Sequence, residues 1–127
     1  MKNLKSMLSA IALLAAVNSA QALEITAYSP QTLADLQKAE QAVSLHFHAE
    51  WCPVCKAQER VFNGWKGDAS VPGTLLIVDY DNERELRKKM GVRSQSTVIS
   101  FKGNREKARL AGDTDARALR AVLDAAK

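Results

Sequence analysis

The sequence predicts an α/β fold in which a central, mixed β-sheet is flanked by helices on both faces. Strand-like and helix-like segments alternate along the chain, and glycine and proline separate several of them. The segment Thr74–Tyr80 (TLLIVDY) is continuously apolar, which is typical of a parallel strand buried on both faces. Alternation of this kind places helices on the two sides of a partly parallel sheet. We therefore expect one domain with one core.

Two strands and two helices are expected in the first half of this domain. Glu24–Ala27 has the length of a short edge strand. A helix is expected over Ser29–Lys38, because a Ser-Pro pair supplies its N-cap and its first helical residue. Val43–His48 is compact, apolar and β-prone, which indicates a buried strand. A second helix follows from Cys52 toward Trp65, with apolar residues at helical spacing on its inner face.

The second half is expected to add three strands and two helices. These are the strands Thr74–Tyr80, Thr97–Phe101 and Ala108–Ala111 and the helices Asn82–Met90 and Asp115–Ala126. Gly91 ends the first of these helices, and Asp113 or Thr114 caps the second. Lys102-Gly103-Asn104 reads as a hairpin turn, so the last two strands are expected to be antiparallel.

The N-terminus has the three parts of a secretory signal peptide. Lys2 and Lys5 form a positive region, Met7–Val17 is apolar, and Ala20-Gln21-Ala22 is a small-x-small cleavage pattern. Residues 1–22 are therefore predicted to be removed, which leaves residues 23–127 as an exported, periplasmic domain. The apolar run is about half of the roughly 20 residues that a membrane helix needs, which disfavours the alternative of an uncleaved anchor.

The charge pattern argues against a nucleic-acid partner. The whole chain has a formal net charge of +4, but Lys2 and Lys5 belong to the segment that is expected to be removed. The remaining charges are interspersed, without the stripe of basic and aromatic residues that nucleic-acid binding favours.

Cys52 and Cys55 are the only cysteines of the chain and are separated by two residues. A pair at this spacing, directly after a strand-like segment, is most simply a redox switch between dithiol and disulfide. A structural crosslink is a weaker explanation, because a disulfide that closes so short a loop restricts the unfolded chain little. Disulfides persist outside the cytosol, so the predicted export agrees with this chemistry.

The position of this cysteine pair at the start of a helix indicates a role for each cysteine. A helix N-terminus stabilises a thiolate through its free N–H groups and its dipole, so Cys52 is expected to be the exposed, attacking cysteine. Cys55, one turn into the helix, is expected to resolve the mixed disulfide. Pro53 stiffens the turn, and Trp51 is expected to offer a flat substrate contact beside the cysteines.

The segment Phe47–Lys56 (FHAEWCPVCK) resembles the active-site segment of the thioredoxin superfamily, and weaker similarity covers nearly all of the predicted mature domain. The resemblance implies a thioredoxin-like fold and thiol–disulfide exchange, with Cys52 as nucleophile and Cys55 as resolving cysteine. We expect a monomer without a metal or other cofactor, whose partners are protein thiols or disulfides. Lys56 and Glu59 are similar to residues of periplasmic domains that receive electrons from a membrane thiol transporter, which implies a membrane thiol electron donor.

The chain departs from this family at the loop before Thr97. The family usually has a cis-proline there that faces the disulfide, whereas this chain has Ser96, preceded by Gln95. A cis bond at a non-proline residue costs about 2.5–4 kcal/mol, so the Gln95–Ser96 bond is expected to be trans. By resemblance, Gln95 and Ser96 belong to the loop that shapes the groove for the substrate backbone. The serine leaves open how that groove is held and whether the cysteine pair captures metal.

A second departure lies six residues before Cys52. Thioredoxins keep a buried acid there and pair it with a lysine, whereas this chain has His46 and, in place of the lysine, Ile77. Because histidine titrates near neutrality, one hypothesis is that His46 is a catalytic residue that accepts the proton of Cys55. The alternative is a neutral core histidine that is hydrogen-bonded to the backbone.

Two classes of function remain open from the sequence. The first is an exported thiol–disulfide oxidoreductase, more simply a reductant or electron carrier than a disulfide-forming oxidant, because the chain lacks the inserted helical domain of strong periplasmic oxidants. The second is a metal-binding module, since His46 and His48 project to one side of a strand close before Cys52 and Cys55. Their His-x-His spacing differs from that of structural zinc sites, so the first class is the leading prediction.

Overall fold

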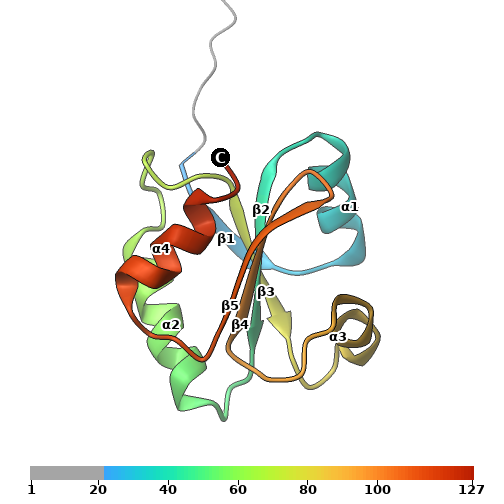
Figure 1. Ribbon diagram of the computed structural model, residues 1–127, viewed down its shortest axis with the longest axis vertical. Coiled ribbons are helices and arrows are strands. Elements are labelled where there is room, and N and C mark those ends of the chain that lie inside the picture. The colour runs from blue at the N-terminus through green and yellow to red at the C-terminus, as the bar shows by residue number, and fades with distance from the viewer. Residues whose placement is uncertain (1–21) are drawn as a thin grey trace, which may run out of the picture.

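The computed structural model describes residues 22–127, so all but the last residue of the predicted signal peptide lies outside the described residues. The cleavage of that peptide stays a prediction. The described chain forms a five-stranded sheet with helices on both faces (Figure 1). The predicted fold class is therefore confirmed.

Over the described residues, five strands and four helices follow one another in the predicted order. They are β1 (Glu24–Ala27), α1 (Pro30–Lys38), β2 (Ala42–His48), α2 (Pro53–Gly64), β3 (Thr74–Asp79), α3 (Arg84–Met90), β4 (Thr97–Lys102), β5 (Arg105–Ala111) and α4 (Ala116–Asp124). None of the helices in this part of the chain has the length and apolar character needed to cross a membrane.

The strand order β1-β3-β2-β4-β5 gives the sheet a parallel half and an antiparallel half. β3 pairs in parallel with β1 and β2, and β4 pairs antiparallel with β2 and β5. β1 and β5 are thus the two edge strands. Because β2 and β3 are parallel, the segments that follow them leave the sheet at the same end, which brings the cysteine segment close to the loop after β3.

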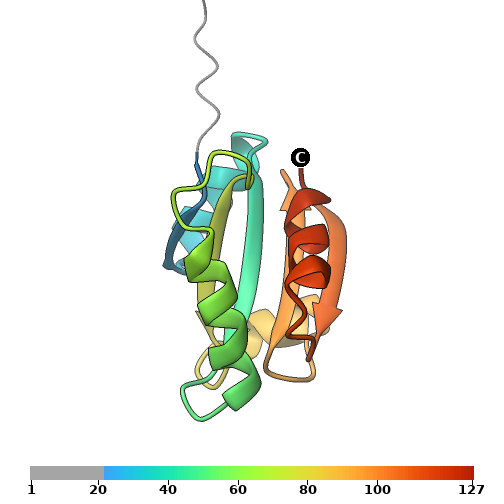
Figure 2. The ribbon, with the colours of Figure 1, turned by 90° about the vertical axis from the view of Figure 1, so that its left-hand side faces the viewer.

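Two apolar clusters hold the helices against the sheet. On one face, Leu33 of α1 and Leu86 of α3 pack with buried residues of the central strands. On the other face, Phe62 of α2 and Leu119 of α4 pack over Leu75 of β3. Figure 2 shows α2 and α4 together on this second face. Burial of these apolar side chains is the main favourable contribution to folding.

The start of α4 differs from the prediction. Its N-cap is Asp115, whose side chain accepts a hydrogen bond from the Ala118 N–H at 3.0 Å. Asp113 lies before the helix, where its carboxylate accepts the Asp115 N–H at 2.8 Å. Several successive residues here can cap a helix, and the sequence alone does not select among them.

The starts of β5 and α3 also differ from the predictions. β5 begins at Arg105, three residues before the predicted Ala108. The sequence did not indicate these residues as part of a strand because they are charged and exposed and show no hydrophobic pattern. α3 begins at Arg84 and not at Asn82. The Asp79 carboxylate accepts the Asn82 N–H at 3.4 Å, which holds that residue in a turn after β3.

Gly73, directly before β3, tolerates no side chain. Its φ of +78° lies in the left-handed region, and a Cβ at this position would overlap the backbone carbonyl of Ala42. Gly67 has nearly the same φ, +79°, but a Cβ there would meet open space. Both glycines thus need a positive φ, but only at Gly73 would a side chain collide with neighbouring atoms.

We expect Gly73→Ala to destabilise the domain by about 1–3 kcal/mol more than Gly67→Ala, because overpacking adds to the strain of a left-handed alanine. Urea unfolding of the disulfide form of both variants measures the difference. Equal unfolding free energies in the two variants would contradict the proposed clash with Ala42.

Candidate active site

Cys52 and Cys55 lie where β2 passes into α2, and they form a disulfide. Cys52 is the N-cap of α2, and its Sγ accepts a hydrogen bond from the Cys55 N–H at 3.1 Å. Pro53 lies at the first turn, where its missing N–H leaves no bond unmade. The sequence-predicted junction of strand, cysteine pair and helix is therefore present.

Both cysteines are buried in the disulfide form: 2% of Cys52 and 0% of Cys55 is exposed. Ala49, Val54 and Tyr80 pack around them. The expectation of an exposed Cys52 is wrong for this form of the protein. The reason is that the capping side chain turns back over the first helical turn, into this small apolar cluster.

Trp51 is the exposed aromatic residue beside the disulfide. Its side chain is 59% exposed, and its indole Nε1–H donates to Asp81 Oδ2 at 2.7 Å. Asp81 follows β3, so this hydrogen bond joins the two segments that leave the sheet at the same end. The indole thus has an exposed face and a fixed orientation, and its role in substrate binding stays a prediction.

Tyr80 is a site residue that the sequence did not indicate. It packs against the cysteine cluster, and its hydroxyl donates to the Arg93 carbonyl at 3.2 Å. The Arg87 guanidinium lies 4.0 Å from the centre of its ring. Its place at the end of the predicted strand Thr74–Tyr80 is a sequence signal that could have found it.

The surface next to Trp51 is acidic. A cleft of about 690 Å³ adjoins this residue, and its lining includes Glu50, Asp79 and the buried His48. His48 Nε2 lies 3.3 Å from Glu59 Oε2, and its Nδ1 lies 3.7 Å from Glu50 Oε1. Across residues 22–127, no three His, Cys, Asp or Glu side chains are arranged to hold a metal ion.

His46 and Gln58 form a buried polar pair between β2 and α2. His46 Nε2 lies 2.8 Å from Gln58 Oε1, and the imidazole packs edge-on against Phe62 and His48. Of the described atoms, none is a hydrogen-bond partner of His46 Nδ1. The alternative prediction of a core histidine hydrogen-bonded to the backbone is wrong about the partner: His46 is hydrogen-bonded to the Gln58 side chain.

Burial keeps His46 neutral. Loss of hydration lowers the pKa of His46 to about 4, while the hydrogen bond to Gln58 acts in the opposite direction and the neighbouring His48 adds to the lowering. At neutral pH one ring nitrogen of His46 therefore carries a lone pair. Whether this lone pair receives the proton of Cys55 stays a prediction.

Ser96 lies in a strained turn beside the disulfide. Its peptide bond to Gln95 is trans, as expected, and its φ is +63°. The Ser96 N–H donates to the Phe47 carbonyl at 2.8 Å, and Cys55 Sγ lies 3.9 Å from the same oxygen. The Ser96 hydroxyl donates to the Gln95 carbonyl, so the structure does not direct it to a cysteine sulfur.

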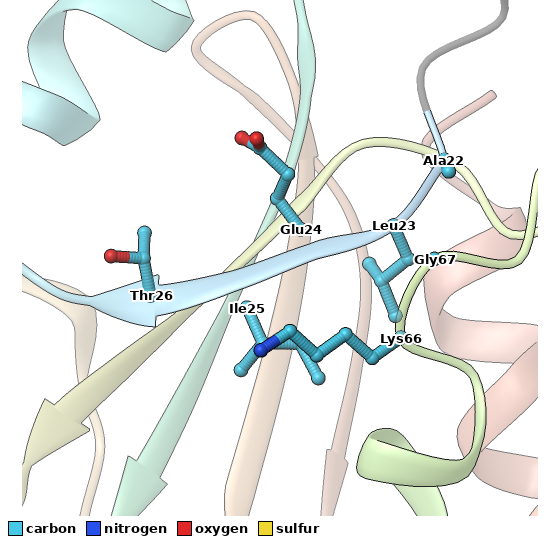
Figure 3. Close-up of a pocket in the computed structure, with 7 residues that line it drawn as sticks. All are labelled: Ala22, Leu23, Glu24, Ile25, Thr26, Lys66 and Gly67. Carbon is cyan, nitrogen blue, oxygen red and sulfur yellow. The ribbon is translucent and has the colours of Figure 1, made fainter.

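A second cleft, of about 700 Å³, lies along β1 and is lined by residues 22–26 together with Lys66 and Gly67 (Figure 3). Glu24 and Thr26 point to one side of the strand, and the Lys66 side chain extends along Ile25 on the other (Figure 3). None of the predicted site residues lines this cleft, so it is separate from the disulfide.

A disulfide at the start of a helix, next to an exposed tryptophan, defines a class of proteins that exchange thiols and disulfides. The thioredoxin family model matches residues 24–125. Thioredoxin-1 of Drosophila melanogaster is 32% identical over 89 residues, which are 66% of this chain and 83% of that protein. The thioredoxin of Rickettsia bellii is 29% identical over 73 residues, which are 58% of this chain and 70% of that protein.

Solved structures agree with this match. Trxlp from Edwardsiella tarda superposes with a TM-score of 0.72 at 29% identity, over 79% of this chain and 98% of that one. A thioredoxin mutant from Halobacterium salinarum gives a TM-score of 0.67 at 21% identity, over 84% and 90% of the two chains, which shows the fold alone. The chain belongs to the thioredoxin family, and it is a thiol:disulfide oxidoreductase.

The buried neutral His46 predicts a pH dependence of stability. An unfolded histidine takes up a proton near pH 6.5, whereas the folded protein resists protonation of His46 until about pH 4. Stability is therefore fully present above pH 6.5 and is lost as pH falls from there to about 4. The lowered pKa corresponds to roughly 3 kcal/mol over this window.

Between pH 7 and pH 4, we expect the free energy of unfolding of His46→Leu to fall by roughly 3 kcal/mol less than that of the wild type, because leucine does not titrate. Urea unfolding at both pH values measures this difference, in which the carboxylates common to both proteins cancel. Parallel pH profiles in the two proteins would show that His46 is not the neutral, buried group described above.

Proposed function

We propose that this thiol:disulfide oxidoreductase is an exported protein that works in the periplasm as a reductant or electron carrier. The export rests on the charged, apolar and small-residue parts of the N-terminal segment. The proposed direction of electron flow, from this protein to its substrate, rests on the surroundings of the disulfide. The partners that we propose are protein disulfides as electron acceptors and a membrane thiol protein as electron donor.

One observation supports the proposed direction of electron flow: apart from its place at the start of α2, Cys52 has little in its described surroundings that would stabilise a thiolate. In residues 22–127, Cys52 Sγ accepts one hydrogen bond, from the Cys55 N–H at 3.1 Å. The cleft beside Trp51, the residue before Cys52, is lined by Glu50 and Asp81 among others, and negative charge near Cys52 would disfavour a thiolate. A strong oxidant has a stabilised reduced form. Weak stabilisation of the reduced form therefore favours a reductant.

The proposed reaction moves two electrons and two protons. The Cys52 thiolate attacks one sulfur of a substrate disulfide, a mixed disulfide forms, and the first substrate thiolate leaves and takes up a proton. Cys55 then loses its proton and attacks Cys52 Sγ, which forms the Cys52–Cys55 disulfide and releases the second substrate thiolate, and this thiolate takes up the second proton. A donor dithiol reverses these steps on the protein and leaves as a disulfide.

Four further residues are proposed to bind the substrate, and one to accept a proton. Trp51 and Pro53 flank Cys52 with exposed side chains, and Gln95 and Ser96 form the turn next to the Phe47 carbonyl. We keep for His46 the role of proton acceptor for Cys55, supported by its unpartnered Nδ1.

A redox titration of residues 23–127 against dithiothreitol and glutathione tests the direction. We expect a reduction potential near that of thioredoxin, about −270 mV, because the Cys52 thiolate gains little from its surroundings beyond the helix start. A potential near −120 mV, as in strong periplasmic oxidants, would reverse the proposed direction. The Cys55→Ala variant, which forms no internal disulfide, is the control for the signal of the cysteine pair.

Expression of the full chain in a Gram-negative bacterium tests export and partners together. We expect a periplasmic protein whose first residue is Leu23. The Cys55→Ala variant should accumulate mixed disulfides on Cys52, because the resolving thiol is missing, and mass spectrometry identifies the trapped proteins. The variant that also lacks Cys52 should trap none. An uncleaved protein in the cytosol would contradict the proposed location.

A further inference from the structure

Gln58 joins three separate segments of the chain around the disulfide. It lies on the inner face of α2, one turn after Cys55, and 0% of it is exposed. Its Oε1 lies 2.8 Å from His46 Nε2, and its Nε2 donates to the carbonyls of Ser96 and Asp113 at 3.0 and 2.9 Å. All three partners are more than ten residues away in sequence, so these bonds are tertiary.

The orientation of this amide follows from its partners. Both hydrogens of the Gln58 amide nitrogen are taken by carbonyl oxygens, which only a donor can satisfy. A flipped amide would set its oxygen against those two oxygens, so Oε1 must face His46. Because Oε1 only accepts, His46 Nε2 carries the proton and Nδ1 carries the lone pair. Gln58 thus selects one tautomer of His46.

The same amide holds the turn at Ser96. A φ of +63° costs a residue with a side chain about 1–2 kcal/mol, so surrounding bonds must fix this conformation. The Ser96 carbonyl accepts from Gln58 and from the Gly112 N–H at 3.2 Å, while the Ser96 N–H donates to the Phe47 carbonyl. The other two partners are backbone groups, whereas Gln58 contributes a side chain. This side chain connects the turn to α2, the helix that begins at the two cysteines.

Packing of the helix against the sheet does not by itself explain an amide at this position. The inner face of α2 also carries Phe62, which packs in an apolar cluster with residues of β3 and α4. Burial of a polar group costs free energy, which its hydrogen bonds offset only in part. An apolar residue of similar volume would fill the site without that cost, but it would leave the His46 ring and the Ser96 carbonyl without their partner.

We propose that Gln58 is a positioning residue of the exchange site, which fixes His46 as the Nε2–H tautomer and anchors the proline-free Ser96 turn beside the disulfide. The inference rests on disulfide exchange at Cys52 and Cys55 and is independent of the direction of electron flow. In place of a proline ring, a side chain from α2 holds the substrate loop, so the loop and the proton-accepting histidine are set by one group.

Two variants of Gln58 separate the two halves of this role. Gln58→Met has a similar length and removes both the acceptor for His46 and the donors to Ser96 and Asp113. Gln58→Glu keeps an acceptor for His46 Nε2–H and replaces the two amide donors by at most one, the hydroxyl of a protonated carboxyl, so at least one of the two carbonyls loses its partner. Gly67→Ala, which perturbs a turn with no contact to the site, is the control for a general loss of stability.

The first readout is nitrogen NMR of the His46 ring in the disulfide form at pH 7. We expect the proton on Nε2 in the wild type, in Gln58→Glu and in Gly67→Ala, and a mixture of tautomers in Gln58→Met. The second readout is amide hydrogen exchange at Ser96 and Gly112, relative to Leu45 in the central strand. Exchange there should accelerate about tenfold in both Gln58 variants, which corresponds to about 1.4 kcal/mol, as expected for a lost hydrogen bond.

The third readout is steady-state reduction of insulin disulfides with dithiothreitol as electron source. We expect KM to rise about tenfold in both Gln58 variants and to stay unchanged in Gly67→Ala, because the substrate loop is no longer held. If insulin is not reduced even by the wild type, the proposed direction or substrate class fails, and the two NMR readouts still decide the role of Gln58.

An unchanged Nε2–H tautomer in Gln58→Met, or wild-type exchange at Ser96 in Gln58→Glu, would overturn the proposal. A KM within twofold of the wild type in both variants would do the same. If Gln58→Met does not fold, Gln58→Asn takes its place with the same expectations, because its shorter side chain cannot reach His46 and both carbonyls at once.

Discussion

The site depends on the junction at which β2 ends and α2 begins. β2 is central in the sheet and buried along nearly its whole length, so its carboxyl end is fixed by neighbours on both sides. Only three residues separate the last residue of β2 from the N-cap cysteine. The sheet therefore determines where the helix starts, and the helix start determines where the disulfide lies.

The Phe47 carbonyl is the point at which this junction meets the Ser96 turn. It accepts the Ser96 N–H, and Cys55 Sγ lies next to it. The Ser96 turn is thereby connected, through this carbonyl, to the sulfur of Cys55. Gln58 reaches the same turn from α2, so the strand, the helix and the loop form a closed ring of contacts.

The sequence was sufficient for the elements whose signals are local. The Ser-Pro start of α1 and the glycine after α3 are examples, because an N-cap and a left-handed C-terminal residue act within one helical turn. The cysteine pair was found for the same reason, since its spacing and its place after a strand are visible along the chain.

The network around the pair could not be predicted in this way. Gln58 reads as an ordinary polar residue of an amphipathic helix, and its three partners come from β2 and from two loops far along the chain. Asp81 and Tyr80 likewise acquire their roles from the parallel pairing of β2 and β3. The exposure of Cys52 was predicted wrongly because its side chain turns back over the first helical turn, where Tyr80 packs with Ala49 and Val54 around the two cysteines.

The two edges of the sheet have a further consequence, which concerns contact between molecules. β1 offers only four residues for pairing, and β5 carries charged side chains along its exposed length. Short and charged edge strands are the features with which natural sheets resist the addition of a strand from another chain. In this chain the free backbone groups at the two margins of the sheet are therefore poorly suited to pairing with a further strand.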